Sequence, residues 1–276
     1  MSLIKILRNS VRKELVRRNE IRKWQTRIDD AVSCPDNVLL PRVKSAGKCI
    51  GEFQVMHNGL KVLRDGYYGP GMTELLIQNK GCHEPQEEVV FSRLLSTLPT
   101  KSTMIELGAY WGFYSMWFVS AIAEAKAYVL EPDQKNLEVC RRNFRENNLA
   151  AEFSNRSIGQ FDPDVSVVTV DDLMAEHALA SVQVLHADIQ GAELEMLEGS
   201  ANSLANGMID NMFISTHSEE LHQNCIKKLK QHDFDILIDI KPAQSFSVDG
   251  LILSRRRDLP PLILPECSLK LSPIPS

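Results

Sequence analysis

A glycine-containing turn carries the first residues whose types and spacing suit ligand binding. It lies in Thr103–Ser115, TMIELGAYWGFYS, where an apolar strand-like run ends and a helix-like run begins. A strand-turn-helix unit of this kind directs backbone N–H groups to the carboxyl edge of a parallel sheet, where doubly wound folds bind ligands. Gly108 lets a ligand approach the backbone, and Gly112 permits a tight turn into the helix. We expect Tyr110, within the turn, to touch the bound cofactor or acceptor.

The spacing of the glycines narrows the ligand class. A dinucleotide fingerprint GxGxxG that begins at Gly108 needs glycines where Tyr110 and Phe113 stand, and the sequence has no GxxxxGK[ST] phosphate loop. Ligands with a pyrophosphate or triphosphate are therefore disfavoured. An NAD-dependent oxidoreductase is the weaker alternative for this reason.

An acidic residue ends the next strand-like segment. Glu131 follows Val129 and Leu130, 19 residues after Gly112. A carboxylate at this place accepts hydrogen bonds from both ribose hydroxyls, as the acidic residue of dinucleotide sites does. Together with Glu106, the arrangement suits a nucleoside that carries a positive charge and no phosphate. We therefore expect S-adenosylmethionine as the cofactor.

Three titratable residues at strand ends are candidates for the proton transfer that methylation of a hydroxyl requires. Alignment of the two reactants contributes an effective molarity on the order of 10⁵ M or more, and a general base about 10²-fold to 10⁴-fold. Asp188 and His217 are the favoured catalytic residues, and His217 would act as a neutral imidazole. His186, two residues before Asp188, either shares its face or packs under a helix. Glu193 follows in the first helical turn, where the helix dipole favours a carboxylate without any function.

The remaining candidates follow from position in the fold. Ser157, at the end of a third strand, is expected beside the adenine, and Glu84 with His83 beside the methionine end of the cofactor. Asp188, Glu193 and His217 are also of types that bind a divalent cation, but the sequence does not show that they converge. We assign no metal.

Four segments resemble one family in order and spacing. They are ELGAYWGFYS, LEPDQKNLEVCRRNFRENN, TVDDL and ADIQGAELEMLEGS, and the stretch from about Glu84 to His217 resembles the FkbM-type S-adenosylmethionine-dependent methyltransferases. The resemblance implies a class I methyltransferase fold with a seven-stranded sheet whose last strand is antiparallel, and methyl transfer to a hydroxyl of a sugar, glycan or natural product. The residues that it implies for cofactor binding and for the reacting methyl group are Glu106, Gly108, Ala109, Gly112, Glu131, Asp188, Gly191, Ala192 and Glu193. Gln190 departs from the acidic residue common in the family.

Alternating strand-like and helix-like segments must position these residues. Short apolar strands alternate with amphipathic helices from position 103 to 254, a pattern that predicts a mostly parallel α/β sheet with helices on both faces. The expected strands are Thr103–Leu107, Ala127–Leu130, Ala151–Ser157, Val168–Val170, Val182–Ala187, Met212–Thr216, Ile236–Ile240 and Gly250–Ser254, and the expected helices are Glu84–Leu95, Gly112–Ala123, Gln134–Asn147, Ala192–Ala205 and Glu219–Lys230. The last strand is expected to be antiparallel because the link before it is too short for a helix.

Three further regions flank this domain, which we place at residues 84–258. Residues 1–30 form a basic amphipathic helical arm, whose apolar stripe is Ile4, Leu7, Val11, Leu15, Ile21, Trp24 and Ile28. The arm either packs on its own body or a second subunit, or docks on an anionic membrane or a partner. Residues 31–83 form a small irregular β-containing cap with a turn at Tyr67–Gly71, which we expect to cover the site. Residues 259–276 form a Pro-rich tail, extended or disordered.

Composition and charge limit the function. With 43% hydrophobic and 24% charged residues among 276, the chain is not disordered, collagen-like or a disulfide-stapled mini-protein. Its six cysteines form no CxxC pair, and no signal-peptide pattern is present, so we expect a reducing, cytoplasmic location. Met1–Ile28 carries nine Lys or Arg and two Glu, a net charge of +7. Because the whole chain has a net charge of −5, the remaining residues carry −12. An acidic body disfavours nucleic acid as a partner. The expected partner is a small-molecule or saccharide acceptor, and the alternative function is a non-catalytic nucleoside-pocket scaffold that docks through the arm.

Overall fold

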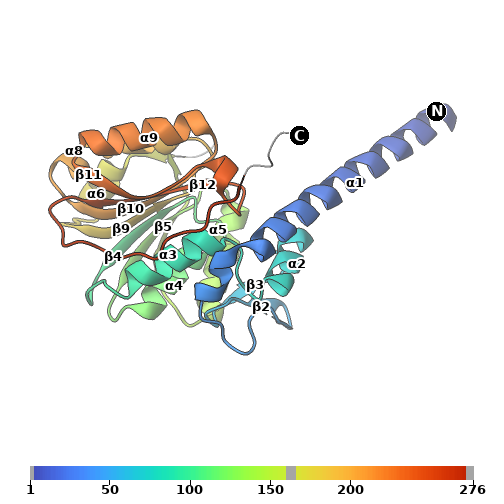
Figure 1. Ribbon diagram of the computed structural model, residues 1–276, viewed down its shortest axis with the longest axis horizontal. Coiled ribbons are helices and arrows are strands. Elements are labelled where there is room, and N and C mark those ends of the chain that lie inside the picture. The colour runs from blue at the N-terminus through green and yellow to red at the C-terminus, as the bar shows by residue number, and fades with distance from the viewer. Residues whose placement is uncertain (1–2, 160–165, 272–276) are drawn as a thin grey trace.

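A seven-stranded sheet forms the centre of the protein in the computed structural model (Figure 1), which describes residues 3–159 and 166–271, with only the backbone for residues 3–16. Its strands are β4 (Thr103–Leu107), β5 (Lys126–Leu130), β6 (Glu152–Ser154), β9 (Val182–Ala187), β10 (Ile209–Thr216), β11 (Phe234–Ile240) and β12 (Gly250–Arg256). Their order across the sheet is β11-β12-β10-β9-β4-β5-β6. The pairs among β10, β9, β4, β5 and β6 are parallel, whereas β12 is antiparallel to both of its neighbours. The predicted seven-stranded sheet with an antiparallel last strand is confirmed.

Helices cover both faces of this sheet. The helices are α3 (Pro85–Leu95), α4 (Phe113–Ala121), α5 (Gln134–Glu146), α6 (Val170–Glu176), α7 (Glu193–Glu198), α8 (Ala201–Ala205) and α9 (Glu219–Gln231). The first three pack on one face, where Phe91, Phe113 and Phe144 are buried with the cap residues. The other four cover the opposite face around Leu173 and Leu229. Successive strand residues alternate between the two cores, as the pleat requires.

Side-chain caps set where several helices begin. Asp133 accepts hydrogen bonds from the backbone N–H groups of Lys135 and Asn136, at 2.7 and 3.2 Å, and starts α5. Thr169 and Asp172 form a reciprocal capping box at the start of α6. Each cap satisfies N–H groups that have no partner within the helix. The short links after β5 and before α6 are fixed in this way.

The structure differs from the predicted elements in the second half of the domain. The expected helix Ala192–Ala205 divides at Gly199 and Ser200 into α7 and α8. The third strand of the large sheet ends at Ser154, so Ser157 does not end it; Ser157 belongs to β7 (Ser157–Ile158), which pairs with β8 (Val167–Val168) in a separate two-stranded sheet. Val170 begins α6 and does not end a strand.

The cap contains more regular structure than its sequence predicts. A 3-10 helix, η1 (Pro35–Leu39), precedes a three-stranded antiparallel sheet of β1 (Cys49–Ile50), β2 (Phe53–Val55) and β3 (Lys61–Leu63). Within the expected turn at Tyr67–Gly71, α2 (Pro70–Gln78) already begins, with proline in its first turn. Glycine and proline punctuation favoured an irregular interpretation of this segment, but burial of Leu75 and Leu76 stabilises a helix.

The arm is a single long helix, α1 (Leu3–Ser33), that projects from the body (Figure 1). Ile28 and Ala31 are buried, and Trp24 packs against the core. A Cβ on Gly71 would lie 2.1 Å from the Trp24 ring, so α2 presses directly on this part of α1. The last turns of α1 therefore pack on the body, whereas Ile21, earlier in the helix, is 55% exposed. The predicted stripe of Ile4, Leu7, Val11 and Leu15 lies outside the described side chains.

The tail is extended and attached to the body as far as residue 271. Ser268 donates from its backbone N–H and its hydroxyl to the carboxylate of Asp36. Lys270 pairs with Asp30 of α1 at 2.6 Å, and Arg93 of α3 donates to the carbonyl of Ile263 at 3.0 Å. The disordered alternative is wrong for this stretch. Between residues 3 and 271, apart from 160–165, no helix is long and apolar enough to cross a membrane.

Candidate active site

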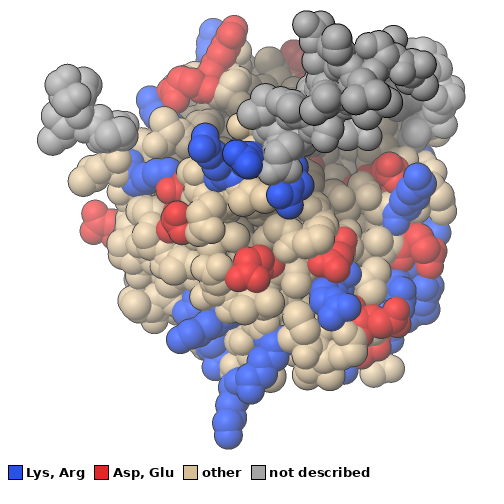
Figure 2. All heavy atoms as spheres, turned by 90° about the vertical axis from the view of Figure 1, so that its right-hand side faces the viewer, with Lys and Arg blue, Asp and Glu red and all other residues tan. Residues whose placement is uncertain are grey.

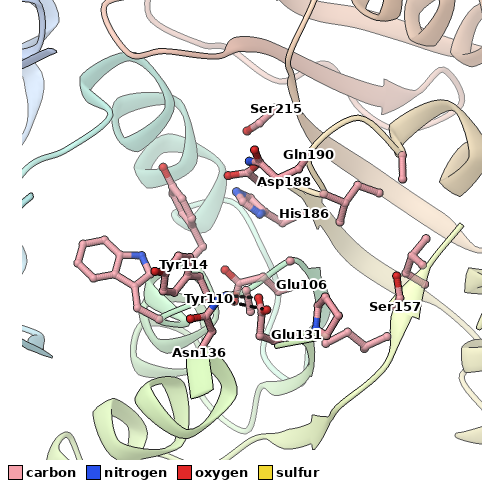
Figure 3. Close-up of a pocket in the computed structure, with 18 of the residues that line it drawn as sticks. Glu106, Tyr110, Tyr114, Glu131, Asn136, Ser157, His186, Asp188, Gln190 and Ser215 are labelled. Atoms are coloured by element: carbon pink, nitrogen blue, oxygen red, sulfur yellow. Dashed lines mark hydrogen bonds between the residues drawn. The ribbon is translucent and has the colours of Figure 1, made fainter. Parts of the chain in front are cut away.

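A cavity of about 480 Å³ lies at the carboxyl edge of the large sheet. Its wall is built from the ends of β4, β5 and β9 and closed by the cap (Figure 3). Most of the predicted site residues line it, namely Glu84, Glu106, Gly108, Ala109, Tyr110, Glu131, Ser157 and Asp188. Gly112 and His217 do not. The sheet edge thus gathers residues that are up to about a hundred positions apart in the chain.

The two glycines of the turn are required by the protein's own packing. Gly108 has φ +74°, and a Cβ there would lie 1.9 Å from the carbonyl oxygen of Asp188. Gly112 has φ +71°, and its Cβ would lie 2.4 Å from Cys140 Sγ. Both positions need glycine for the left-handed backbone and for space. Glycine is therefore needed at these positions because protein segments come into close contact. The sequence alone had suggested other reasons, namely ligand approach at Gly108 and a tight turn at Gly112.

Glu131 is held in place by the glycine turn. The backbone N–H of Tyr110 donates to one carboxylate oxygen at 2.9 Å, and the N–H of Asp133 donates to the other at 2.9 Å. Burial raises the pKa of Glu131, and the two N–H donors oppose this shift. Tyr110 has φ +46°, a left-handed conformation that costs a non-glycine residue free energy. The strained turn orients a carboxylate on the cavity wall where we expect the ribose.

A buried charge network underlies one end of the cavity. His83 Nε2 lies 3.1 Å from Glu84, and its Nδ1 lies 2.6 Å from Glu88. Burial disfavours a charged His83, but the two carboxylates outweigh this effect and raise its pKa to about 10. Burial likewise raises the pKa of both glutamates, and the interaction with His83 outweighs it and lowers each to about 2. Tyr114 donates to Glu84 at 2.9 Å, which fixes that carboxylate at the cavity surface.

Glu106 and His186 form the floor of the cavity (Figure 3). Glu106 accepts from the backbone N–H of Ser115 at 3.0 Å, and burial raises its pKa. His186 Nε2 lies 2.6 Å from Glu87 of α3. His186 and Asp188 both line the cavity, and His186 also packs under α3. The structure therefore combines the two positions that the sequence left open for His186.

Asp188, which lines the cavity, has His217 as a neighbour. His217 Nε2 lies 3.2 Å from Asp188 Oδ1 and 3.4 Å from Asp249, and His217 Nδ1 lies 3.1 Å from Glu193. Burial disfavours a charged imidazole, but these three carboxylates raise its pKa to about 10. An imidazolium cannot accept a proton, so this environment opposes the neutral-imidazole role expected for His217. Asp188 remains the carboxylate that faces the cavity.

Two residues carried no functional signal in the sequence: Tyr67, which lines the cavity, and Asp249, which does not. Asp249 becomes a neighbour of His217 because Thr216 pairs with Gly250 across the antiparallel β10–β12 ladder. Burial raises the pKa of Asp249 to about 7. The predicted antiparallel last strand was the only available signal for this contact. From the cap, Tyr67 stacks on Trp111 with ring centroids 4.3 Å apart.

No group of three or more His, Cys, Asp or Glu side chains in the described chain has an arrangement suited to a metal ion. The carboxylates around His217 instead use the imidazole as their counter-charge. Gln190, with φ +54°, donates to Asp188 Oδ1 at 2.9 Å. The amide that replaces an acidic residue of the family therefore supports the Asp188 carboxylate.

Comparison with known proteins gives a family match for part of the chain. Residues 144–236 match the model of the methyltransferase FkbM domain. The match spans a third of the chain, from the end of α5 into β11, and contains Asp188 and His217. Over these residues it confirms the resemblance to the FkbM methyltransferases. The glycine turn and Glu131 precede the matched residues.

Solved structures with a similar fold include several methyltransferases. TrmK from M. capricolum in complex with S-adenosyl-homocysteine shares 12% identity at a TM-score of 0.43, covering 60% of this chain and 67% of that one. A precorrin-6y C5,15-methyltransferase from Geobacter metallireducens shares 12% identity at a TM-score of 0.42, covering 62% of this chain and 87% of that one. An rRNA methylase from Streptococcus thermophilus shares 11% identity at a TM-score of 0.46, covering 62% of this chain and 96% of that one. No curated protein matches the sequence. Independently of these matches, the seven-stranded sheet with an antiparallel β12 is the one expected from the sequence.

Proposed function

We propose that this methyltransferase transfers the methyl group of S-adenosylmethionine to a hydroxyl of a saccharide or a glycosylated small molecule. The observation that carries the proposal is Asp188, a carboxylate on the cavity wall whose Oδ1 is fixed by Gln190 and by His217. Direct transfer to a hydroxyl needs one proton acceptor beside the methyl donor and no metal.

The lining of the cavity fits the cofactor. Glu131 suits the ribose, because its carboxylate is already oriented by two backbone N–H groups. Glu84 and Glu106 give the opposite end negative charge, which suits the cationic methionine end. Ser157 lies on the wall beyond Glu131, where we expect the adenine. Bound S-adenosylmethionine supplies an electrophilic methyl group.

The chain's own residues then handle the proton. With the cofactor bound, the acceptor oxygen would take the methyl group as the bond between the methyl carbon and the sulfur breaks, and S-adenosyl-homocysteine would leave. The hydroxyl proton would pass to the Asp188 carboxylate. The imidazolium of His217 keeps its own proton and, 3.2 Å from Asp188 Oδ1, orients that carboxylate. Such a base contributes about 10²-fold to 10⁴-fold, and alignment of the acceptor contributes more.

The cavity mouth supports a small acceptor. Tyr68 of the cap is 47% exposed, and its ring lies 5.2 Å from that of Tyr110. Aromatic rings that carry a hydroxyl group suit a ligand with one apolar face and several polar groups, such as a sugar ring. The net charge of −12 outside Met1–Ile28 supports a small molecule over nucleic acid.

Calorimetric titration with S-adenosylmethionine and with S-adenosyl-homocysteine tests the cofactor site. Glu131→Ala removes the ribose partner and is expected to weaken both affinities by about tenfold to a hundredfold, because a hydrogen bond to a charged group is lost twice. Glu138→Ala, an exposed glutamate of α5, is the matched control and should bind like the wild type. Equal binding by Glu131→Ala would refute the ribose assignment. A screen of hydroxylated saccharides for methyl transfer then tests the acceptor class.

A further inference from the structure

An arginine of α1 lies beside Tyr68, a residue that lines the cavity. The guanidinium carbon of Arg27 lies 5.4 Å from the centroid of the Trp24 ring and 5.8 Å from that of the Tyr68 ring. Trp24 precedes it by one helical turn, whereas Tyr68 comes from the cap and lines the cavity. Both separations are within the range of cation–π contacts. The two rings therefore position the guanidinium without using its N–H groups.

The guanidinium of Arg27 lacks an anionic partner. Its Nε is buried and has no hydrogen-bond acceptor, and no carboxylate of the described residues forms an ion pair with it. A buried donor without an acceptor costs free energy, so this group is incomplete in the free protein. A guanidinium presents parallel N–H groups that match a carboxylate or a phosphate.

The acidic groups nearby do not fill this role, because each has another partner. Glu84 pairs with His83, and Asp249 lies beside His217. The charge of Arg27 reaches both carboxylates through space but makes no contact with them. On the face from which α1 projects, a group of Lys and Arg side chains lies in the upper centre, and side chains of both signs are mixed over the rest (Figure 2).

We propose that Arg27 binds a negatively charged group, a carboxylate or a phosphate, on the methyl acceptor. The inference rests on the proposed function, because it places the acceptor over Tyr68. The charges of Asp188 and Arg27 both act on the hydroxyl of that tyrosine, so both groups lie near it. An acceptor that lies across Tyr68 can present its hydroxyl to Asp188 and its anion to Arg27. The acceptor class is then an acidic saccharide, such as a uronate or a sugar phosphate, and a neutral sugar leaves Arg27 without a partner.

Calorimetry on the protein saturated with S-adenosyl-homocysteine tests this assignment. The probes are inorganic phosphate, which needs no particular sugar, and the pair D-glucuronate and D-glucose. We expect phosphate and glucuronate to bind, with glucose at least about tenfold weaker, because a charge-assisted hydrogen bond is absent. Arg27→Gln should lose this preference, and Arg27→Lys should retain part of it because the charge remains.

Arg22→Gln is the matched control, since Arg22 is exposed on the same helix. It should behave like the wild type, and thermal melts check that each variant is folded. Anion binding that is absent, or equal in Arg27→Gln and the wild type, overturns the inference. A loss of S-adenosyl-homocysteine affinity in Arg27→Gln also overturns it, because Arg27 then holds the cofactor's own carboxylate. Failure of the wild type to bind S-adenosyl-homocysteine refutes the proposed function instead.

Discussion

Asp188 is the residue whose substitution most directly tests the chemistry. Asp188→Asn keeps the size of the side chain but removes the proton acceptor. We expect turnover to fall by about 10²-fold to 10⁴-fold, while the affinity for S-adenosyl-homocysteine stays close to that of the wild type. Initial rates with an acceptor from the saccharide screen, together with calorimetry, measure the two effects separately. Unchanged turnover would move the base to Asp249, whose pKa of about 7 suits proton transfer near neutral pH.

Gly108 tests the packing of the glycine turn. In Gly108→Ala the new Cβ meets the Asp188 carbonyl oxygen, at 1.9 Å before relaxation, on a backbone with φ +74°. We expect a loss of roughly 1–3 kcal/mol from backbone strain alone, and more from the clash. Gly51→Ala is the control, because it shares a positive φ but meets nothing within 4 Å. Urea denaturation compares them, and equal losses would show that the contact with Asp188 is unimportant.

Single residues also show where sequence reasoning stops. Glu131 and Asp188 follow apolar strands directly, so strand periodicity places them at the sheet edge. Asp249 and Tyr68 lie in loops whose path depends on tertiary packing, and no local pattern marks them. The charge state of His217 depends on three carboxylates from separate segments, which the sequence does not bring together.

At the scale of elements, the tail attaches through one buried carboxylate. Asp36 of η1 is 3% exposed and accepts from Ser268. Asp36→Ala should release residues 262–271, with a loss of about 1.5–3 kcal/mol, because hydrogen bonds to a charged group are removed. Hydrogen exchange should become faster in the tail and remain slow in β4. Asp258→Ala, an exposed residue at the start of the tail, is the control, and tail protection that persists in Asp36→Ala would contradict this attachment.

Elements were predictable where hydrophobic period and length agree. β4 and β9 have the predicted bounds, because a continuous apolar run in a buried parallel strand is hard to interpret otherwise. α2 was not predicted, because its nine residues begin with proline and glycine after a turn. Its stability comes from packing against α1, which is a tertiary effect that local propensity does not contain.

At the scale of the whole molecule, the buried network around His83 links stability to pH. Glu84 and Glu88 have their pKa lowered to about 2, below the ordinary value of 4.5. Their ionised forms therefore stabilise the folded protein above pH 4.5, and this contribution is lost as the pH falls toward 2. His83 has its pKa raised to about 10 from 6.5, so its contribution is complete below pH 6.5 and is lost as the pH rises toward 10.

The protein should consequently be most stable between about pH 4.5 and 6.5 with respect to this network, and Glu88→Gln should remove part of that dependence. Chemical denaturation from pH 3 to pH 9 measures it as the free energy of unfolding. Glu88→Gln leaves His83 with one carboxylate in a buried site, so the variant should be destabilised at pH 6 and should approach the wild type at pH 3, where protonation has already weakened the network. Arg257→Ala, which breaks exposed ion pairs with Asp233 and Asp235, should leave the pH profile unchanged because such pairs contribute little. A parallel offset between Glu88→Gln and the wild type at every pH would mean that the network contributes packing and no charge to the fold that carries the site.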